Sequence, residues 1–383
     1  MGAVMADNRS PKFVFASDSF KGTLSSQDTA RLLTEAAREV FPYCECVAVP
    51  MADGGEGTTA ALVAACGGEL RRVRVHDALG RPVEAEFGLL SDGRAVVETA
   101  AASGLPLLAA DERDPLRATT YGAGELIRAA LDAGAREVIV ALGGLATNDG
   151  GMGLVRALGA RFLDENGTEL EGTGADLRRV CAIDLGGLDP RLADVPFIAM
   201  CDVDNPLLGP DGATRTFGPQ KGADAAALEE LEAGMTNYAR VLSQTLGFDA
   251  ETPGAGAAGG LGAACQAFLG ARMERGVDLV MRLVGLHEAL DGASVCVTGE
   301  GHADAQTAHG KVVSGVAMAC AAADVPCVAI VGGMDAAGGV LFGLSAMVPT
   351  QIEPMSLEEA LARAEELYAL AARRVFSLLS LRV

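Results

Sequence analysis

The sequence predicts an α/β protein built from two domains. Half of its 383 residues are hydrophobic, which is enough apolar material for two cores of ordinary size. Aromatic residues make up only 4% and glycines number 49, a composition typical of close-packed helices and strands joined by many short loops. Apolar, β-branched runs repeatedly end in a polar, glycine-rich loop and lead into a helical pattern, which favours mostly parallel sheets.

The strand–loop–helix units can be followed along the chain. The first strand is expected at residues 12–16, and the helix after it begins at a capping box formed by Ser25 and Asp28. Further strands of the same kind are expected at 46–50, 136–142, 196–201, 293–298 and 326–331. Because parallel strands direct their carboxyl ends toward one edge of a sheet, the loops that follow them are expected to gather in one or two clefts.

The region from about 71 to 100 has a different pattern. Apolar and polar residues alternate there, with turn signals at Leu79–Gly80 and Asp92–Gly93, as in an antiparallel meander. We therefore predict a second α/β domain with a mixed sheet at residues 66–290. It is inserted into a first domain formed by residues 1–65 and 291–383.

Helices are also predicted in the second domain and at the end of the chain. Two are expected at about 121–133 and 224–246. The last helix is expected from Leu357 to about Leu379, after a capping box of Ser356 and Glu359, and to pack on the first domain.

Charge and cysteine content exclude several classes of partner. The net charge of −21 argues against nucleic acid and anionic membranes, which are bound through clusters of Lys and Arg. No apolar run is long enough to cross a bilayer, and residues 1–13 lack the apolar core of a signal peptide.

The nine cysteines, an odd number without CxxC spacing, are expected to be buried thiols rather than metal ligands or disulfides. We expect a cytoplasmic protein.

Acidic residues are concentrated in the loops that follow the predicted strands. Hard oxygen ligands suit Mg²⁺, and nucleotide phosphates supply further oxygens. This concentration therefore favours a site for a metal and an anion. The residues are Asp18, Asp53, Glu56, Asp149, Asp202, Asp204, Glu300 and Asp304.

Lysine is rare in this chain and occupies distinctive positions. Only four of the 30 cationic residues are lysines, and Lys21, Lys221 and Lys311 each adjoin a glycine. A lysine is a compact point charge that suits a phosphoryl or carboxylate group close to the backbone. The loop 143–151 follows a predicted strand, and its free amide groups are expected to bind an anion.

Two other classes of function remain open on these patterns. The stretch GAGAAGG at 254–260 resembles a dinucleotide fingerprint, which would suit an NAD-dependent hydroxy-acid dehydrogenase, but it follows no convincing strand. A non-enzymatic binding protein for a small acid is the other alternative. The chain contains no GxxxxGK[ST] loop, no GxSxG elbow and no histidine pair at zinc-ligand spacing.

Seven motifs in order make the chain resemble the type I glycerate kinases. They are DSFKGTLS, ADGGEGT, GGLATNDGG, CDVDNPLLGPDGAT, FGPQKGAD, GAGAAGGLGAA and TGEGHADAQTAHGK. The resemblance implies an ATP-dependent kinase that phosphorylates D-glycerate, most often at the 2-hydroxyl, with the 3-hydroxyl as the alternative. It also implies a flavodoxin-like domain and a second α/β domain around a cleft. The chain departs from the family pattern at Leu145, where serine is typical, and at His302, where arginine is typical.

The resemblance and the chemistry of phosphoryl transfer together suggest roles for the loop residues. Asp18 or Asp202 would orient the hydroxyl, and Lys21 would contact the transferred phosphate or the glycerate carboxylate. The expected Mg²⁺ ligands are Asp53, Glu56, Glu300 and Asp304. Substrate or phosphate contacts are expected from Ser19, Gly54, Gly55, Gly143, Gly144, Thr147, Asn148, Asp149, Asp204, Asn205, Lys221, Gln306 and Lys311. The expected cosubstrate and cofactor are ATP and Mg²⁺, and we expect a monomer or a homodimer.

Overall fold

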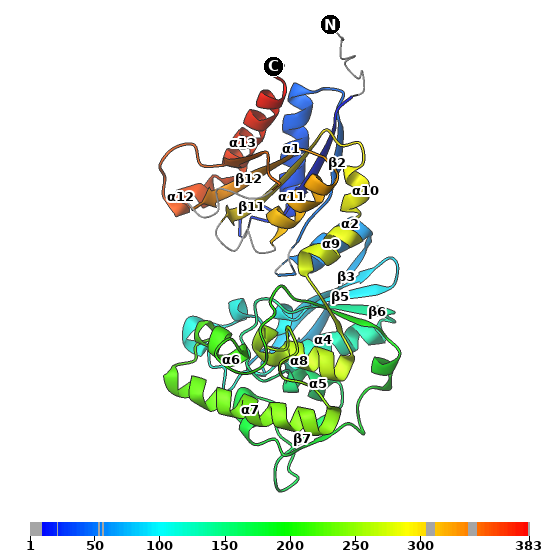
Figure 1. Ribbon diagram of the computed structural model, residues 1–383, viewed down its shortest axis with the longest axis vertical. Coiled ribbons are helices and arrows are strands. Elements are labelled where there is room, and N and C mark those ends of the chain that lie inside the picture. Colours follow the sequence, from blue (N-terminus) through cyan, green and yellow to red (C-terminus); the bar gives the residue numbers. More distant parts are fainter. Residues whose placement is uncertain are drawn as a thin grey trace. The chain divides into compact units, whose positions relative to one another are not determined.

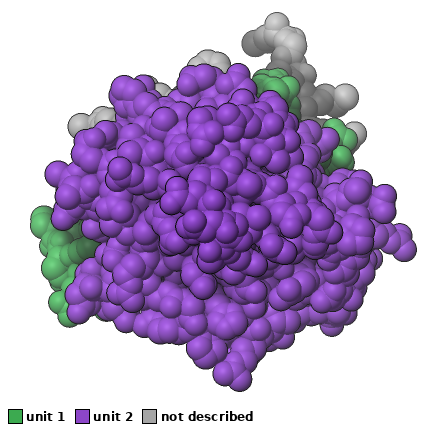
Figure 2. Space-filling model, turned by 90° about the horizontal axis from the view of Figure 1, so that it is seen from below, with its two compact units in different colours: residues 1–53, 277–383 green, residues 54–276 purple. Residues whose placement is uncertain are grey.

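The structure, a computed structural model, describes residues 10–20, 22–52, 54–55, 57–303, 311–335 and 343–381 (Figure 1). The chain forms two compact units, coloured separately in Figure 2. Unit 1 comprises residues 1–53 and 277–383, and unit 2 comprises residues 54–276.

Unit 1 contains a five-stranded sheet in which every pair of neighbouring strands is parallel. Its strands are β1 (Lys12–Ser17), β2 (Glu45–Ala48), β11 (Val295–Ala303), β12 (Cys327–Met334) and β13 (Ala346–Pro349). Their spatial order is β2-β1-β11-β12-β13. With the strands ranked along the chain this is the order 2-1-3-4-5 of flavodoxin-like folds, so the predicted class of this domain is confirmed.

Helices cover both faces of this sheet (Figure 1). Helices α1 (Ser26–Val40) and α13 (Ala364–Leu379) lie side by side over one face, and α11 (Val312–Ala322) packs on the other. Alternate strand residues point to opposite faces, and Phe13 and Phe15 of β1 both meet Phe376 of α13. The capping box of Ser25 and Asp28 starts α1 as predicted.

Unit 1 also contains three shorter helices. They are α9 (Gly276–Leu283), which begins at the boundary between the units, α10 (Leu286–Leu290) and α12 (Leu357–Ala362). The helix predicted from Leu357 to Leu379 is interrupted at Arg363, where α12 ends and α13 begins. Its second part packs on α1 and β12.

Unit 2 contains a six-stranded mixed sheet in the order β10-β9-β6-β5-β4-β3. The strands are β3 (Gly68–His76), β4 (Pro82–Leu90), β5 (Arg94–Glu98), β6 (Glu137–Ala141), β9 (Phe197–Met200) and β10 (Arg272–Glu274). The first three form the predicted antiparallel meander, and β5, β6, β9 and β10 pair in parallel. A separate pair, β7 (Arg161–Leu163) and β8 (Ala182–Asp184), was not predicted because each strand is only three residues long.

The helices of unit 2 complete its core. They are α2 (Thr58–Cys66), α3 (Ala100–Ser103), α4 (Tyr121–Asp132), α5 (Met152–Ala157), α6 (Ala213–Phe217), α7 (Ala225–Leu246) and α8 (Ala257–Leu269). Two of them, α4 and α7, match the helices predicted at 121–133 and 224–246. The Asp224 side chain caps α7 by accepting a hydrogen bond from the Ala227 amide.

Two further details differ from the sequence-based expectations. The predicted boundaries at 65/66 and 290/291 place α2 in the first domain, but the units divide at 53/54 and 276/277 because α2 packs on β3, β4 and β5. The segment that begins with Glu300 was expected to be a loop. Instead β11 continues to Ala303, paired with β12, because Glu300 lies opposite Val331 and Ala303 opposite Met334.

None of the described helices has the length and apolar character that a membrane span requires.

Candidate active site

A cavity of about 600 Å³ opens at the carboxyl ends of the parallel strands of unit 1. Residues that follow β1 and β13 and residues at the carboxyl ends of β11 and β12 line it, together with α12 and the start of α11. In an open parallel sheet the strand order reverses between β1 and β11, which is the position where such folds bind ligands. The volume lies within the range of small-molecule sites.

The lining of this cavity includes charged groups that the sequence had indicated. Asp18 follows β1 directly: its backbone amide donates to the Gly299 carbonyl at 2.9 Å, and its Oδ1 accepts from the Ser19 amide at 2.7 Å. Glu300 lies on β11 and is nearly buried, while Lys311 is the N-cap residue of α11. The fold therefore brings Asp18, Ser19, Glu300 and Lys311 to one cavity.

The lining also includes an apolar surface from α12. Leu357 and Leu361 of α12 line the cavity, and their side chains remain 72% and 47% exposed. Ala360 and Ala364 extend the same wall. This surface was not predicted, because the sequence indicated Leu357 and Leu361 only as part of the last helix, which was expected to pack on the first domain.

His302, Thr350 and Gln351 also line the cavity. His302 lies in the motif TGEGHADAQTAHGK, which had indicated it as a candidate ligand contact as well as a departure from the family pattern. Thr350 and Gln351 had been missed, because they follow β13, a strand that was not predicted. The available signal was the apolar stretch 346–349, which is short and which Pro349 ends.

A second group of predicted residues lies at the carboxyl edge of the sheet in unit 2. Gly143 follows β6 so closely beside Gly54 and Gly55 that an added Cβ would lie 3.4 Å from the Gly54 carbonyl oxygen and the Gly55 Cα. Gly144 is exposed there. Asp202, after β9, is exposed, and its Oδ1 accepts from the Gly276 amide at 2.9 Å.

Asp204 and Asn205 follow Asp202 in the same loop. Asp204 is exposed. The side-chain amide of Asn205 donates a hydrogen bond to the backbone carbonyl of Asp211 at 2.6 Å, which links the two ends of this loop. Another acid of this edge was missed: Glu98, at the end of β5, accepts from the amides of Gly57 and Thr59 at the start of α2.

The remainder of the loop 143–151 turns into the protein. Asp149 is fully buried, and its Oδ2 accepts from the amide and hydroxyl of Thr120 at 2.7 and 2.8 Å. It also accepts from the amides of Gly151 and Gly153 at 3.1 and 3.2 Å. Burial raises the pKa of Asp149, and these hydrogen bonds oppose that rise. The Asp149 carboxylate in this way joins the starts of α4 and α5. Because it is fully buried, a phosphate group cannot reach it in this arrangement, contrary to the expected contact.

Lys221 lies in the same interior. Its ammonium donates to the Thr147 carbonyl at 2.7 Å, and the residue is only 2% exposed. Burial lowers the pKa of Lys221 to about 7, although the negative charge of Asp149 acts to raise it. The side chain of Asn148, also buried, donates to the Thr214 hydroxyl at 3.1 Å.

The glycine-rich stretch 254–260 packs against this interior. Gly259 has a φ of +72°, and a Cβ there would lie 2.2 Å from the Thr147 carbonyl oxygen and 2.8 Å from the Lys221 nitrogen. The Gly150 amide also donates to the Gly259 carbonyl at 3.1 Å. These contacts account for the glycines through close packing rather than through a dinucleotide.

Five of the predicted site residues lie outside the described residues: Lys21, Asp53, Glu56, Asp304 and Gln306. Their expected roles stay predictions.

Comparisons with known proteins agree on one family. The glycerate kinase family matches residues 13–380. The chain is 43% identical to glycerate 2-kinase from Escherichia coli over 374 residues, which cover 97% of this chain and 98% of that protein. It is 44% identical to glycerate kinase from Bacillus subtilis, covering 95% and 96% of the two chains. A crystal structure from Salmonella typhimurium LT2, named as a glycerate kinase 2, superimposes with a TM-score of 0.88 at 42% identity, covering 97% and 98%.

Proposed function

This chain belongs to the glycerate kinase family, and from that premise we propose that it transfers the γ-phosphoryl group of ATP to the 2-hydroxyl of D-glycerate. The products are 2-phosphoglycerate and ADP. The observation that carries the proposal is the cavity of unit 1, whose lining combines two carboxylates and a lysine with apolar side chains of α12. We propose that the reaction takes place in the cytoplasm.

We propose that the cavity of unit 1 holds ATP. Leu357 and Leu361 offer an apolar surface to the adenine ring, and burial of such surface favours binding. The polyphosphate would lie toward Lys311, at the start of α11. The amide groups and positive dipole of a helix N-terminus favour phosphate there, and the lysine adds a point charge.

The donor set of the same cavity fits Mg²⁺. Asp18 and Glu300 supply carboxylate oxygens, the hard ligands that this ion takes together with substrate phosphates. We propose that these two residues hold it. The ion, when bound, would neutralise charge on the phosphoryl oxygens.

Residues of unit 2 are the proposed contacts for the acidic substrate. Gly143 and Gly144 present exposed backbone after β6, and Asp202 is exposed after β9. Backbone amides can bind a carboxylate, and the Asp202 carboxylate can accept a hydrogen bond from the hydroxyl that attacks. Holding the hydroxyl in line with the γ-phosphorus is the main task of the protein in such a transfer.

Phosphorus NMR of the purified protein with ATP, Mg²⁺ and D-glycerate tests the proposal. The expected result is one new signal, that of 2-phosphoglycerate, which appears as ADP forms and is lost when EDTA replaces Mg²⁺. A 3-phosphoglycerate signal would keep the kinase and reject the proposed position of transfer. Unchanged ATP in the presence of D-glycerate would reject the kinase activity. A parallel reaction with L-glycerate tests whether the enzyme is specific for the D-enantiomer.

A further inference from the structure

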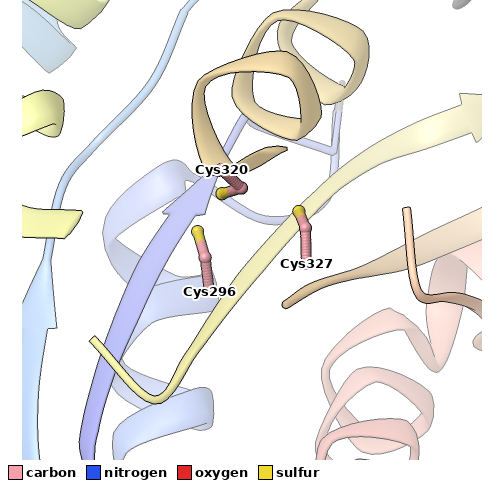
Figure 3. A group of neighbouring side chains, drawn as sticks. All are labelled: Cys296, Cys320 and Cys327. Carbon is pink, nitrogen blue, oxygen red and sulfur yellow. The ribbon is translucent and has the colours of Figure 1, made fainter. Parts of the chain in front are cut away.

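Three cysteine side chains from separate elements of unit 1 converge in its interior. Cys296 lies on β11, Cys320 on α11 and Cys327 on β12, and the three side chains gather between the helix and the strands (Figure 3). All three sulfur atoms lie within 4.8 Å of one another. The residues are fully buried.

The convergence follows from the sheet and not from the sequence spacing. Successive strand residues point to opposite faces, so Cys296, flanked by Val295 and Val297, points away from the face on which those valines pack. Cys296 and Cys327 are direct partners in the parallel register of β11 and β12. Cys320 comes from the helix that packs on these two strands.

The donor atoms of this cluster are all sulfur. Within the part of the chain that the structure describes, it is the one group of three or more Cys, His, Asp or Glu ligand atoms close enough to share an ion. Sulfur atoms bound to one ion at about 2.3 Å in a trigonal arrangement lie about 4 Å apart, which is compatible with the observed limit. Thiolates favour soft cations over Mg²⁺.

We propose that Cys296, Cys320 and Cys327 bind one soft, closed-shell metal cation and that this ion fastens α11 to β11 and β12. A divalent cation would displace three thiol protons, leaving a complex with one negative charge. Each thiol would bind the ion as a thiolate, the form that coordinates metal.

In this proposal a cation would enter when the end of α11 frays, since the cluster itself is fully buried. Cys320 lies two residues before the end of this helix, and the residues from Ala321 to Asp324 that follow are exposed. Helix ends fray, so this opening leaves the core between the sheet and α13 intact.

The cluster is distinct from the cavity of the proposed reaction. Nine residues separate Cys320 from Lys311, and a rise of 1.5 Å per residue places them about 13 Å apart along α11. None of the three cysteines lines the cavity. The proposed site therefore does not depend on the proposed function.

Cadmium titration of the full-length protein tests the proposal. Cys44 and Cys46 must first be replaced, as Cys44→Ser and Cys46→Ser, because their sulfur atoms are 3.5 Å apart and form a competing thiol pair. In this background we expect one equivalent of Cd²⁺ to bind, with a thiolate charge-transfer absorption and a ¹¹³Cd NMR shift typical of three sulfur donors. The thermal midpoint should rise, since an ion that binds the folded state stabilises it.

Single replacements then locate the ion. Cys320→Ala or Cys327→Ala should weaken Cd²⁺ binding by about 100-fold or more, because each removes one of three ligands. The matched control is Cys265→Ala, which removes a buried thiol of unit 2 and should leave binding unchanged. Absence of binding in the Cys44/Cys46 background, or equally tight binding after Cys320→Ala, would overturn the proposal. If the variants fail to fold, the ¹¹³Cd shift in that background decides alone: a two-sulfur shift rejects the site.

Discussion

The carboxyl edges of the two main sheets use similar loops for different purposes. In unit 1 a cavity is lined by residues that follow β1, among them the partly exposed Asp18, and by Glu300 at the carboxyl end of β11. In unit 2 the loop after β6 has two exposed glycines and then turns inward, so that Thr147, Asn148 and Asp149 are fully buried. A polar, glycine-rich loop after a parallel strand can therefore either bind a ligand or hold the fold together.

Packing explains the difference. The start of α8 runs through left-handed residues at 258–260, which brings its backbone against Thr147 and Asn148. Polar groups removed from water in this way must find partners in the protein. Asp149 accepts hydrogen bonds from Thr120, Gly151 and Gly153. Lys221 donates a hydrogen bond to the Thr147 carbonyl.

The largest expected effect tests the structural side of this comparison. Asp149→Asn replaces one carboxylate oxygen with an NH2 group, which donates hydrogen bonds and cannot accept them. The remaining oxygen cannot serve both the Gly151 amide at Oδ1 and the Thr120 and Gly153 groups at Oδ2, so part of the network is lost. Removing one member of a buried polar network costs about 3 kcal/mol or more. We expect the free energy of unfolding to fall by that amount in a urea titration.

Asp204→Asn is the matched control for this change. Asp204 is exposed at the same sheet edge, and its replacement should alter the free energy of unfolding by less than about 0.5 kcal/mol. A loss of stability below about 1 kcal/mol in the Asp149 variant would show that the loop does not depend on this carboxylate.

The next effect concerns the cavity of unit 1. Glu300→Gln keeps the shape of the side chain but removes the charge proposed to hold Mg²⁺, so we expect kcat to fall about 100-fold. The Mg²⁺ concentration needed for half-maximal rate should rise as well. Initial-rate measurements over a Mg²⁺ series give both quantities.

The control for Glu300 is Glu45→Gln. Glu45 is exposed at the start of β2 and does not line the cavity, so its variant should retain the original rate and Mg²⁺ dependence. If Glu300→Gln keeps full kcat at the same Mg²⁺ concentration, Glu300 is not a ligand and the cavity loses its proposed metal.

A smaller effect follows from the buried lysine. The pKa of Lys221 falls from its ordinary value of 10.5 to about 7 in the folded protein. Between pH 7 and 10.5 Lys221 is protonated in the unfolded chain but largely neutral in the folded protein. The free energy of unfolding therefore increases with pH over this range. Below pH 7 the lysine is charged in both states, and the cost of burying that charge is present in full. Relative to Lys221→Met, the original protein should gain about 2 kcal/mol between pH 7 and 9.

The measurement is a urea titration of both proteins at several pH values. Taking the difference between them removes the contribution of every other titrating group. A difference that does not change between pH 7 and 9 would mean that Lys221 keeps its ordinary pKa and that its ammonium is hydrated in the folded state.

The sequence predicted the fold better than it predicted the roles of the polar residues. Buried parallel strands such as β1 and β12 are nearly continuous apolar runs, and the cap at Ser25 is a local signal, so both could be recognised. The same periodicity placed Asp18 and Glu300 at one edge. Asp149 could not be assigned in this way, because an aspartate that binds a ligand and one that joins two helix starts look identical in a sequence.

The unpredicted features depend on contacts between distant segments. His302 was expected in a loop, but pairing with Gly333 of β12 extends the strand through it. Cys296 and Cys327 become neighbours only when β11 and β12 pair in their observed register. Local patterns carry no information on such partners.

The smallest expected effect tests whether the apolar wall of the cavity distinguishes it from the edge of unit 2. Leu361→Ala removes apolar surface from the proposed adenine contact; losing about 40 Å² of buried area costs about 1 kcal/mol, so KM for ATP should rise about 5-fold. The change should leave kcat and KM for D-glycerate nearly unchanged. Leu378→Ala, on an exposed position of α13 that does not line the cavity, is the control. Equal KM values for ATP in the two variants would exclude the adenine ring from α12, whereas a selective rise for Leu361→Ala would place nucleotide binding in unit 1.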